Sequence, residues 1–485
     1  MKADVVVIGA GIVGAWIARE LAKYDLATVV VEKESDVAQG ASKANTAILH
    51  AGYDPEPGTL KAALCVRGNQ LYDELAEQLH ISIKRTGSLV VAFSDEETDV
   101  LRELLRRGIE NGVQGLRIVD RDELRAIEPN LNPASIAGLY TRSAGIVNPF
   151  EAVRACAEEA SLNGVRFILD TEVTGFTISD REVKEVATTH GRICTEIVVN
   201  ASGVYADTVA GEAGLKTFKI TPRKGEYMVL DPNIGDIVHT VLFPIPTAVS
   251  KGITVTPTTD GNILIGPTSE EIQNRTDVST TQEGLKKVLT ESQKLVPSIS
   301  PRDVIRVFAG IRAVSDTNDF IIESSKDVEG FINVAGIQSP GVTAAPAIAE
   351  MVVKIVGELV NLRPKETVRR RHCVRSFRDA SLDERRQLFQ IDHRYGRVVC
   401  RCETVTEAEI VDAIHRVPGA RTVDGVKVRT RAGMGRCQGS FCGPRVLEIL
   451  CRELELHPSQ VTLRGGGSWL LIGRCKRGIE DEEKR

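Results

Sequence analysis

Residues 3–34 read ADVVVIGAGIVGAWIARELAKYDLATVVVEKE, in which a glycine-rich turn and an amphipathic segment separate two apolar runs. Such runs are typical of buried strands and the segment between them is long enough for a helix, so the stretch predicts a strand–helix–strand unit. Gly9 permits the tight turn after the first strand, and Gly11 lets the backbone approach a pyrophosphate. Gly14 allows the helix to pack closely on the strand.

This turn predicts a dinucleotide as its ligand. The phosphates would lie at the helix N-terminus, where free N–H groups and the helix dipole favour anions. Glu32 ends the second strand, 21 residues after Gly11, and its carboxylate would accept hydrogen bonds from ribose hydroxyls and repel a 2′-phosphate. The glycines alone do not distinguish FAD from NAD.

Length and composition limit the classes of protein to consider. A chain of 485 residues predicts two or three domains. The formal net charge of −5 excludes an overall basic field, so we expect no nucleic-acid partner. The N-terminus has no signal-peptide pattern and no apolar stretch reaches the ~18 residues of a membrane span. We therefore expect a cytoplasmic protein without a transmembrane segment, and peripheral membrane association through a partner stays open.

Six further motifs follow in order along the chain. They are GASKANTAILHAGYDPEPGTLKAALCVRGN (40–69), GIVNPFEAV (145–153), VVNASGVYAD (198–207), RKGEYMVL (223–230), VFAGIRAVSD (307–316) and GIQSPGVTAAPAIAE (336–350). Together with the N-terminal unit they resemble the D-amino acid oxidase-like superfamily, especially its glycerol-3-phosphate dehydrogenase and L-2-hydroxyglutarate dehydrogenase branches. The resemblance covers about residues 3–360 and implies an α/β fold. In this fold a discontinuous Rossmann-like FAD-binding domain is interleaved with an antiparallel-sheet substrate domain, inserted at about 80–150 and 215–305.

The same resemblance implies which residues lie near FAD. Residues 341–343 would begin a helix aimed at the flavin ring, where N–H groups stabilise negative charge on the reduced flavin. The full set that the resemblance implies is Gly9, Ala10, Gly11, Gly14, Glu32, Lys33, Ser42, Asn45, Val173, Ala201, Gly203, Gly341, Val342 and Thr343.

Three side chains are candidates for the substrate pocket. Arg312 occupies the place where the family has an anion-binding arginine, and its guanidinium could hold a phosphate or carboxylate with two hydrogen bonds. A structural ion pair is the alternative for Arg312. His50 is the first candidate for the base, because its ordinary pKa suits proton transfer. It could instead only pack against the flavin, or carry it covalently. Lys251 is a weaker candidate for binding the substrate, as are Arg223 and Lys224.

The identity of the substrate rests on a few positions. The hydroxyglutarate pattern has a histidine where this chain has Thr254, and GIVNPFEAV resembles the glycerol-3-phosphate branch. We therefore expect a small anionic secondary alcohol, with glycerol 3-phosphate ahead of L-2-hydroxyglutarate or another 2-hydroxy acid. An amine- or amino-acid-oxidising enzyme of the same superfamily and a redox-responsive scaffold with a vestigial flavin are the rival hypotheses.

The last part of the chain has a different chemistry. In VVCRCETVTEAEIVDAI (398–414) and RAGMGRCQGSFCGPRVLEIL (431–450), 34 residues separate the pair Cys400 and Cys402 from the pair Cys437 and Cys442. Four thiolates from two loops can hold one [2Fe-2S] cluster. Glycines would let the backbone N–H groups approach the sulfides: Gly433, Gly435, Gly439 and Gly443.

This pattern resembles the bacterioferritin-associated ferredoxin-like [2Fe-2S] domain. Zinc is the alternative occupant, although structural zinc usually takes Cys-x2–4-Cys pairs and not Cys-x-Cys. We expect a small helical domain at 396–455, after a basic connector at 363–395 and before a tail at 456–485. We expect no role for Cys373, Cys451 or Cys475. The hypothesis is that electrons pass from flavin to cluster and then to a separate acceptor protein subunit.

Overall fold

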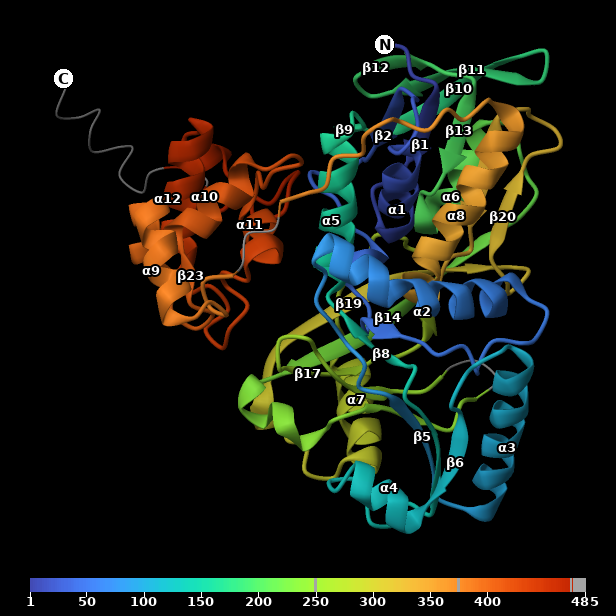
Figure 1. Cartoon of the computed structure of the whole chain (residues 1–485), viewed down its shortest axis with the longest axis vertical. Helices are drawn as coiled ribbons and strands as arrows, with labels where there is room; N and C mark the ends of the chain where they lie inside the picture. The colour runs from blue at the N-terminus through green and yellow to red at the C-terminus, as the bar shows by residue number, and fades with distance from the viewer. Residues whose placement is uncertain (248–250, 373–375, 472, 474–485) are drawn as a thin grey trace. The chain divides into compact units, whose positions relative to one another are not determined.

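The computed structural model describes residues 1–247, 251–372, 376–471 and 473. These residues divide into two compact units (Figure 1). Residues 1–33 and 37–372 build the first unit, and residues 34–36 and 376–473 belong to the second. The segment 363–395, which the sequence predicts to be one connector, is therefore shared between the units.

A mainly parallel sheet forms the centre of the first unit. Its strand order is β20–β21–β13–β1–β2–β9, and only β20 is antiparallel to its neighbour. The strands are β1 Val5–Ile8, β2 Thr28–Val31, β9 Arg166–Ile168, β13 Ile197–Asn200, β20 Ile321–Ser324 and β21 Phe331–Ala335. Because strands from distant parts of the chain pair in one sheet, the Rossmann-like domain is discontinuous, as predicted.

Helices cover one face of this sheet, and a small antiparallel sheet packs near the other (Figure 1). The helices bury a common apolar core in which Trp16 is fully buried. They are α1 Ile12–Leu21, α2 Leu60–Leu79, α5 Pro149–Leu162 and α8 Gly341–Leu359. The small sheet consists of β10 Val173–Ser179, β11 Glu182–Thr188 and β12 Gly191–Cys194, with α6 Ala206–Glu212 beside it. None of the helices in the described ranges has the length and hydropathy needed to cross a bilayer.

The substrate domain is a second, mostly antiparallel sheet, as predicted. Its strand order is β18–β14–β17–β16–β15–β5–β7–β6, and β19 pairs with β14. The strands are β5 Ser88–Ala92, β6 Arg117–Asp120, β7 Ala137–Thr141, β14 Ile220–Leu230, β15 Val241–Pro244, β16 Thr254–Pro257, β17 Ile263–Gly266, β18 Glu270–Glu271 and β19 Val304–Ser315. The long ladder of β14 with β19 places Arg312 opposite Arg223.

Smaller elements complete the first unit. Helices α3 Asp95–Glu110, α4 Arg121–Ile127 and α7 Gln282–Leu295 pack against the substrate sheet. A short sheet of β3 Ile48–Leu49, β4 Ile83–Lys84 and β8 Gly145–Val147 contains the strand that immediately precedes His50.

The second unit is small and mainly helical, as predicted. It contains α9 Leu382–Ile391, β22 Val398–Cys400, β23 Val405–Thr406, α10 Glu407–His415, α11 Val423–Thr430 and α12 Gly443–Leu454. Helix α10 begins with a capping box between Thr406 and Glu409, which satisfies backbone N–H groups at its N-terminus. Val461 is buried in the core of this unit, so the folded part continues beyond residue 455.

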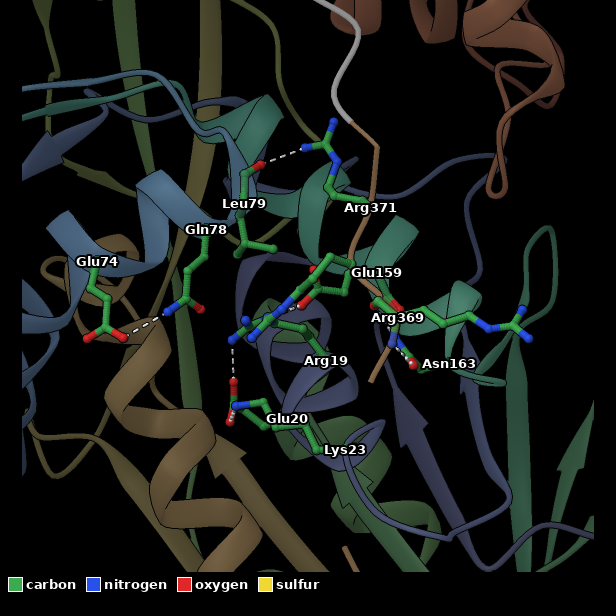
Figure 2. Close-up of polar contacts among 11 residues, drawn as sticks. Arg19, Glu20, Lys23, Glu74, Gln78, Leu79, Glu159, Asn163, Arg369 and Arg371 are labelled. Atoms are coloured by element: carbon green, nitrogen blue, oxygen red, sulfur yellow. Dashed lines mark hydrogen bonds and ion pairs between the residues drawn. The ribbon is translucent and has the colours of Figure 1, made fainter. Parts of the chain in front are cut away.

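Residues 363–371 lie along the first unit as an extended strap, which we define by this range (Figure 2). The backbone N–H of Arg369 donates to the side-chain oxygen of Asn163, and the side-chain amide of Asn163 donates to the carbonyl oxygen of Arg369. Arg371 is buried and donates to the carbonyl oxygen of Leu79. The buried carboxylate of Glu159 receives hydrogen bonds from Arg19 and from Arg370 of the strap, each at 3.0 Å. The basic segment therefore includes an arginine, Arg371, that is packed into the protein.

Candidate active site

The glycine turn after β1 leaves no room for side chains. Gly9 has a φ of +101°, and a Cβ on it would lie 2.6 Å from the carbonyl oxygen of Ala201. A Cβ on Gly14 would lie 2.0 Å from the carbonyl oxygen of Gly9. Helix α1 follows Gly11 with no acidic residue in its first turn. The backbone therefore forms the close, anion-accepting cradle that a pyrophosphate requires.

Two side chains line this cradle. The carboxylate of Glu32 accepts a hydrogen bond of 2.7 Å from the N–H of Ala10, and the hydroxyl of Ser42 accepts one of 2.8 Å from Ile12. Asn45 shapes the preceding loop, because its amide group donates to the carbonyl oxygens of Ala41 and Ser42. In this structure Asn45 supports the loop that positions Ser42.

The other predicted cofactor residues gather at the carboxyl edge of the parallel sheet. Ala201 follows β13 and donates its N–H to the carbonyl oxygen of Ile8, while Gly203 begins a short 3-10 helix. Thr171 donates its N–H to the carbonyl oxygen of Glu32, which brings the start of β10 at Val173 near the same edge. The ammonium group of Lys33 lies 3.8 Å from the ring centroid of Tyr205. Sheet topology thus brings residues from distant parts of the chain, such as Ile8 and Ala201, to one edge.

The N-terminus of α8 is fixed against the strand that precedes His50. The buried hydroxyl of Thr343 donates to the carbonyl oxygen of Ile48 and accepts a hydrogen bond of 2.9 Å from the N–H of His50. A Cβ on Gly68 would lie 2.0 Å from the carbonyl oxygen of Thr343, so α2 approaches this helix backbone closely. The first turn of α8, from Gly341, has no acidic residue. Both helix N-termini that the sequence assigns to FAD therefore favour an anionic ligand.

His50 lies beside a hydroxyl group. Its Nε2 is 3.1 Å from the Oγ of Ser339, and its ring lies 5.9 Å from that of Phe243. Burial, and secondly the positive charge of Lys251, hold the pKa of His50 well below its usual value. The imidazole is consequently neutral near pH 7 and able to accept a proton.

Lys251 is held by a carboxylate that the sequence did not point to. Its Nζ lies 2.8 Å from an oxygen of Asp54. Burial acts to raise the pKa of Asp54, but the interactions with Lys251, His50 and Arg107 together outweigh this effect, and the pKa lies below its usual value. Asp54 and Ser339 both occur within the quoted motifs, yet no local spacing reveals that each contacts one of the predicted residues.

Arg312 has a buried donor group without a partner among the described residues. Its Nη2 donates to the carbonyl oxygen of Thr268 at 2.6 Å. Its Nε is buried and, among the described residues, has no hydrogen-bond acceptor. Burial and then the positive charge of Arg223 lower its pKa, although Tyr227 opposes them. A buried guanidinium N–H without an acceptor is costly, and an anionic ligand would satisfy it.

The weaker candidates are engaged elsewhere. Arg223 pairs with Glu271 at 2.8 Å, and the buried Lys224 pairs with Asp277 at 2.9 Å. The hydroxyl of Thr254 donates to the carbonyl oxygen of Gly266. In this structure Arg223 and Lys224 therefore form ion pairs that hold β14 to its neighbours.

The four cysteines of the second unit form two pairs. The sulfur atoms of Cys402 and Cys437 are 3.8 Å apart, and Cys402 is exposed. Cys400 and Cys442 are buried neighbours. Burial and the neighbouring Cys400 raise the pKa of the Cys442 thiol to about 12.

This arrangement bears on the choice between iron–sulfur and zinc. Structural zinc usually takes Cys-x2–4-Cys pairs, whereas this site contains the Cys-x-Cys pair of Cys400 and Cys402. Two pairs of thiols suit a two-iron cluster, which takes one pair at each iron. The donor set therefore fits [2Fe-2S] better than zinc.

Backbone groups surround these sulfur atoms. The N–H groups of Phe441, Gly439 and Ser440 lower the pKa of the Cys437 thiol. A Cβ on Gly435 would lie 2.4 Å from the Cβ of Cys402. A Cβ on Gly443 would meet nothing within 4 Å, so no neighbouring group requires a glycine at this position.

The other described cysteines do not join this group. Cys65 and Cys156 are buried, whereas Cys194 is exposed on the edge strand β12. Cys451 lies partly buried against the core of the second unit. Cys373 and Cys475 lie outside the described residues.

Comparison with known proteins places this site in a family. Residues 4–355 match the family of FAD dependent oxidoreductases, and residues 398–452 match the BFD-like [2Fe-2S] binding domain. A glycerol 3-phosphate dehydrogenase of Caloramator mitchellensis is 43% identical over 98% of this chain and 100% of its own length. A human mitochondrial L-2-hydroxyglutarate dehydrogenase is 28% identical over 74% of this chain and 89% of its own length.

Solved structures agree with this assignment. A dithionite-reduced L-alpha-glycerophosphate oxidase of Mycoplasma pneumoniae with FAD bound has a TM-score of 0.73 at 30% identity, over 77% of this chain and all of its own. An L-proline dehydrogenase of P. horikoshii has a TM-score of 0.66 at 28% identity, over 74% of this chain and 95% of its own. The chain therefore belongs to the FAD-dependent oxidoreductases and combines the FAD domain of that family with a C-terminal [2Fe-2S] domain.

Proposed function

We propose that this protein oxidises glycerol 3-phosphate to dihydroxyacetone phosphate and delivers the electrons through its [2Fe-2S] cluster to a separate acceptor protein in the cytoplasm. The observation that carries the substrate assignment is the buried Nε of Arg312, which has no acceptor among the described residues. The relatives named glycerol 3-phosphate dehydrogenase and oxidase, at 43% and 33% identity, support the same substrate.

Residues of this chain would divide the chemistry between them. Arg312 would bind the phosphate group, because a guanidinium can give it two charge-assisted hydrogen bonds. His50 would take the proton of the secondary hydroxyl, and the contact between its Nε2 and Ser339 would fix the orientation of the ring. Lys251 would add positive charge near the anionic substrate, and Asp54 would fix the position of Lys251. FAD, when bound, supplies the acceptor for the two electrons and the hydrogen from carbon.

Cofactor contacts can be assigned to the predicted residues in the same way. The cradle of Gly9, Gly11 and Gly14 would hold the pyrophosphate, with Glu32 near the ribose. The N-terminus of α8 at Gly341 would face the flavin. The four cysteines would hold the cluster, which can accept one electron at a time from a two-electron donor. No second glycine fingerprint for NAD occurs in the sequence, which favours a protein acceptor.

A substrate panel tests the proposal. We expect glycerol 3-phosphate to bleach the flavin absorbance anaerobically, and L-2-hydroxyglutarate and L-proline to leave it unchanged. Later loss of the broad cluster absorbance would report electron transfer from flavin to cluster. Bleaching by L-2-hydroxyglutarate or L-proline alone would refute the substrate assignment. A dithionite-reducible flavin that none of the three bleaches would favour the scaffold hypothesis.

The variant Arg312→Lys tests the phosphate contact. A lysine cannot make the bidentate contact, so we expect affinity for glycerol 3-phosphate to fall about 10- to 100-fold, as the loss of a charge-assisted hydrogen bond predicts. The matched control is Arg306→Lys on the same strand, where residue 306 is exposed. Equal affinity in Arg312→Lys and wild type, measured by flavin reduction at varied substrate concentration, would remove Arg312 from the site.

A further inference from the structure

One edge of the cysteine site reaches the protein surface. Cys402 is exposed and Cys437 is partly exposed, whereas Cys400 and Cys442 are buried. A cluster bound by these four thiols is therefore closest to solvent at the Cys402–Cys437 pair. Electron exchange with another protein depends on close approach, so this edge is where a partner has to dock.

The two loops that carry the cysteines are strongly basic. Residues 397–403 and 429–445 contain six arginines: Arg397, Arg401, Arg429, Arg431, Arg436 and Arg445. Their one acidic residue is Glu403, which is buried and paired with Arg378 and Arg431. Four of the six arginines pair with acidic groups: Arg397 with Glu407, Arg429 with Asp36, Arg431 with Glu403 and Arg445 with Glu448. The positive charge at the exposed edge of the site is carried by Arg401 and Arg436, whose side chains are exposed beside the cysteines. This is a local feature, because the whole chain has a formal charge of −5.

Arginine and an aromatic ring flank the exposed pair. The guanidinium carbon of Arg401 lies 5.0 Å from the ring centroid of Phe441, and the Phe441 side chain is 59% exposed. Arg436 is also exposed and immediately precedes Cys437. We define Arg401, Arg436 and Phe441 as the cluster rim. An exposed aromatic side chain with adjacent arginines is the composition that is enriched at protein interfaces.

We propose that the cluster rim is the docking surface for an acidic electron-acceptor protein, whose carboxylates surround its own redox centre. The inference rests on the proposed route of electrons through the [2Fe-2S] cluster. Opposite charge speeds the encounter and orients it, and the apolar ring of Phe441 supplies the area that excludes water at the centre of the contact. A second copy of this chain does not suit this surface, since it would bring two arginine rims together.

The first experiment needs no substrate, so its outcome is independent of the glycerol 3-phosphate assignment. The full-length protein is reduced with dithionite, and reoxidation of the cluster is followed by stopped-flow absorbance with two probes of opposite charge. These are hexacyanoferrate(III), which is an anion, and hexaammineruthenium(III), which is a cation. Added salt should lower the rate of cluster reoxidation by the anion, because it screens attraction, and raise the rate with the cation, because it screens repulsion. If the overall charge of −5 governed the reaction, salt would raise the rate with the anion and lower the rate with the cation. That result would overturn the proposal.

Charge reversal at the cluster rim tests whether these residues cause the charge dependence of the reoxidation rate. In Arg401→Glu/Arg436→Glu we expect the rate with hexacyanoferrate(III) at low salt to fall on the order of tenfold and the rate with hexaammineruthenium(III) to rise, because unscreened charges act over about 10 Å or more. The control is Arg386→Glu on α9, whose side chain is 77% exposed. Iron content and cluster absorbance verify that the variant still holds its cluster. Equal effects in the control and the rim variant would overturn the proposal.

A binding measurement distinguishes other occupants. Fluorescently labelled poly-L-glutamate should bind the wild-type protein at low salt and bind the rim variant at least several-fold more weakly. Tighter binding of an RNA oligonucleotide of equal charge would point to a nucleic acid and overturn the proposal. So would a rim variant whose flavin-to-cluster electron transfer slows in the absence of any acceptor, since the rim would then serve the protein's own flavin unit.

Discussion

At the scale of single residues, the protonation state of His50 depends on its burial and on two neighbours, Lys251 and Asp54. Burial and the charge of Lys251 both disfavour the imidazolium form and lower the pKa of His50 below the ordinary value of 6.5. Asp54 acts in the opposite direction but is paired with Lys251. The result is a base that remains unprotonated over the physiological range, which proton abstraction requires.

The pH dependence of flavin reduction follows from this shift. Protonation removes the base, so the second-order rate constant for flavin reduction by glycerol 3-phosphate should stay level from pH 8 to 6.5 and fall only at lower pH. In Lys251→Met one cause of the depressed pKa is lost. The pKa of His50 then rises and the fall should begin at higher pH. An exposed lysine on α7 provides the control, Lys294→Met. An unchanged midpoint in Lys251→Met would exclude Lys251 as a cause.

A single glycine next to the cluster can be tested against its neighbour. In Gly435→Ala the new Cβ would lie 2.4 Å from the Cβ of Cys402, so the cysteine has to move. We expect lower iron and sulfide content per chain and weaker cluster absorbance, with unchanged FAD content. Gly443→Ala is the matched control, because its Cβ would meet nothing within 4 Å. Equal cluster content in both variants would contradict this account.

At the scale of elements, the strap is joined to α1 and α5 by a buried ionic network. Arg19 and Glu159 are 1% and 2% exposed, and the guanidinium of Arg19 also lies 5.6 Å from the ring of Trp16. A buried charge that loses its partner is strongly destabilising, whereas the intact network contributes much less. The network therefore sets where residues 363–371 lie more than it adds to overall stability (Figure 2).

Removing the carboxylate of Glu159 tests how much the buried network contributes to stability. Glu159→Gln removes the buried carboxylate and leaves Arg19 paired only with Glu20, so we expect the free energy of unfolding of the first unit to fall by about 1–3 kcal/mol. Urea denaturation followed by flavin fluorescence measures it. Glu103→Gln on the exposed helix α3 breaks surface pairs with Arg106 and Arg107 and should change little. A similar loss in both variants would show that burial does not decide the effect.

At the scale of the whole molecule, the two units have separate hydrophobic cores. The core of the first unit lies between α1, α2, α5, α8 and the parallel sheet, and that of the second lies among α10, α11 and α12. Ligand binding stabilises only the unit that holds the ligand. Cluster binding should accordingly contribute to the folding free energy of the second unit alone.

Loss of one buried cysteine tests this separation. Cys442→Ala should abolish the cluster and lower the temperature at which the second unit unfolds, while the temperature of FAD release stays the same. Differential scanning calorimetry and flavin fluorescence measure the two events. Cys451→Ala, on the same helix, removes a thiol outside the cluster and serves as the control. A parallel fall in the temperature of FAD release would contradict separate folding.

Local pattern in the sequence was sufficient for the parts of the protein that local forces determine. Strand, turn and helix at residues 3–34 were predictable because the apolar periodicity and the glycines act within a few residues of each other. Each cysteine pair was recognisable from its local spacing, whereas the assignment of both pairs to one [2Fe-2S] site came from the resemblance of the whole pattern to a known domain. The alternation of the two domains came from motifs that occur in order along the chain.

Tertiary structure alone decided which distant groups meet. The contact of Asp54 with Lys251, the burial of Arg371 in the strap and the pairing of Cys402 with Cys437 join residues with no shared local pattern. Gly435 and Gly443 look alike in the sequence, yet only one of them faces a neighbouring backbone or side chain at close range. Local periodicity records how a segment folds, whereas the surroundings of a side chain depend on which surfaces pack together once the whole chain has folded.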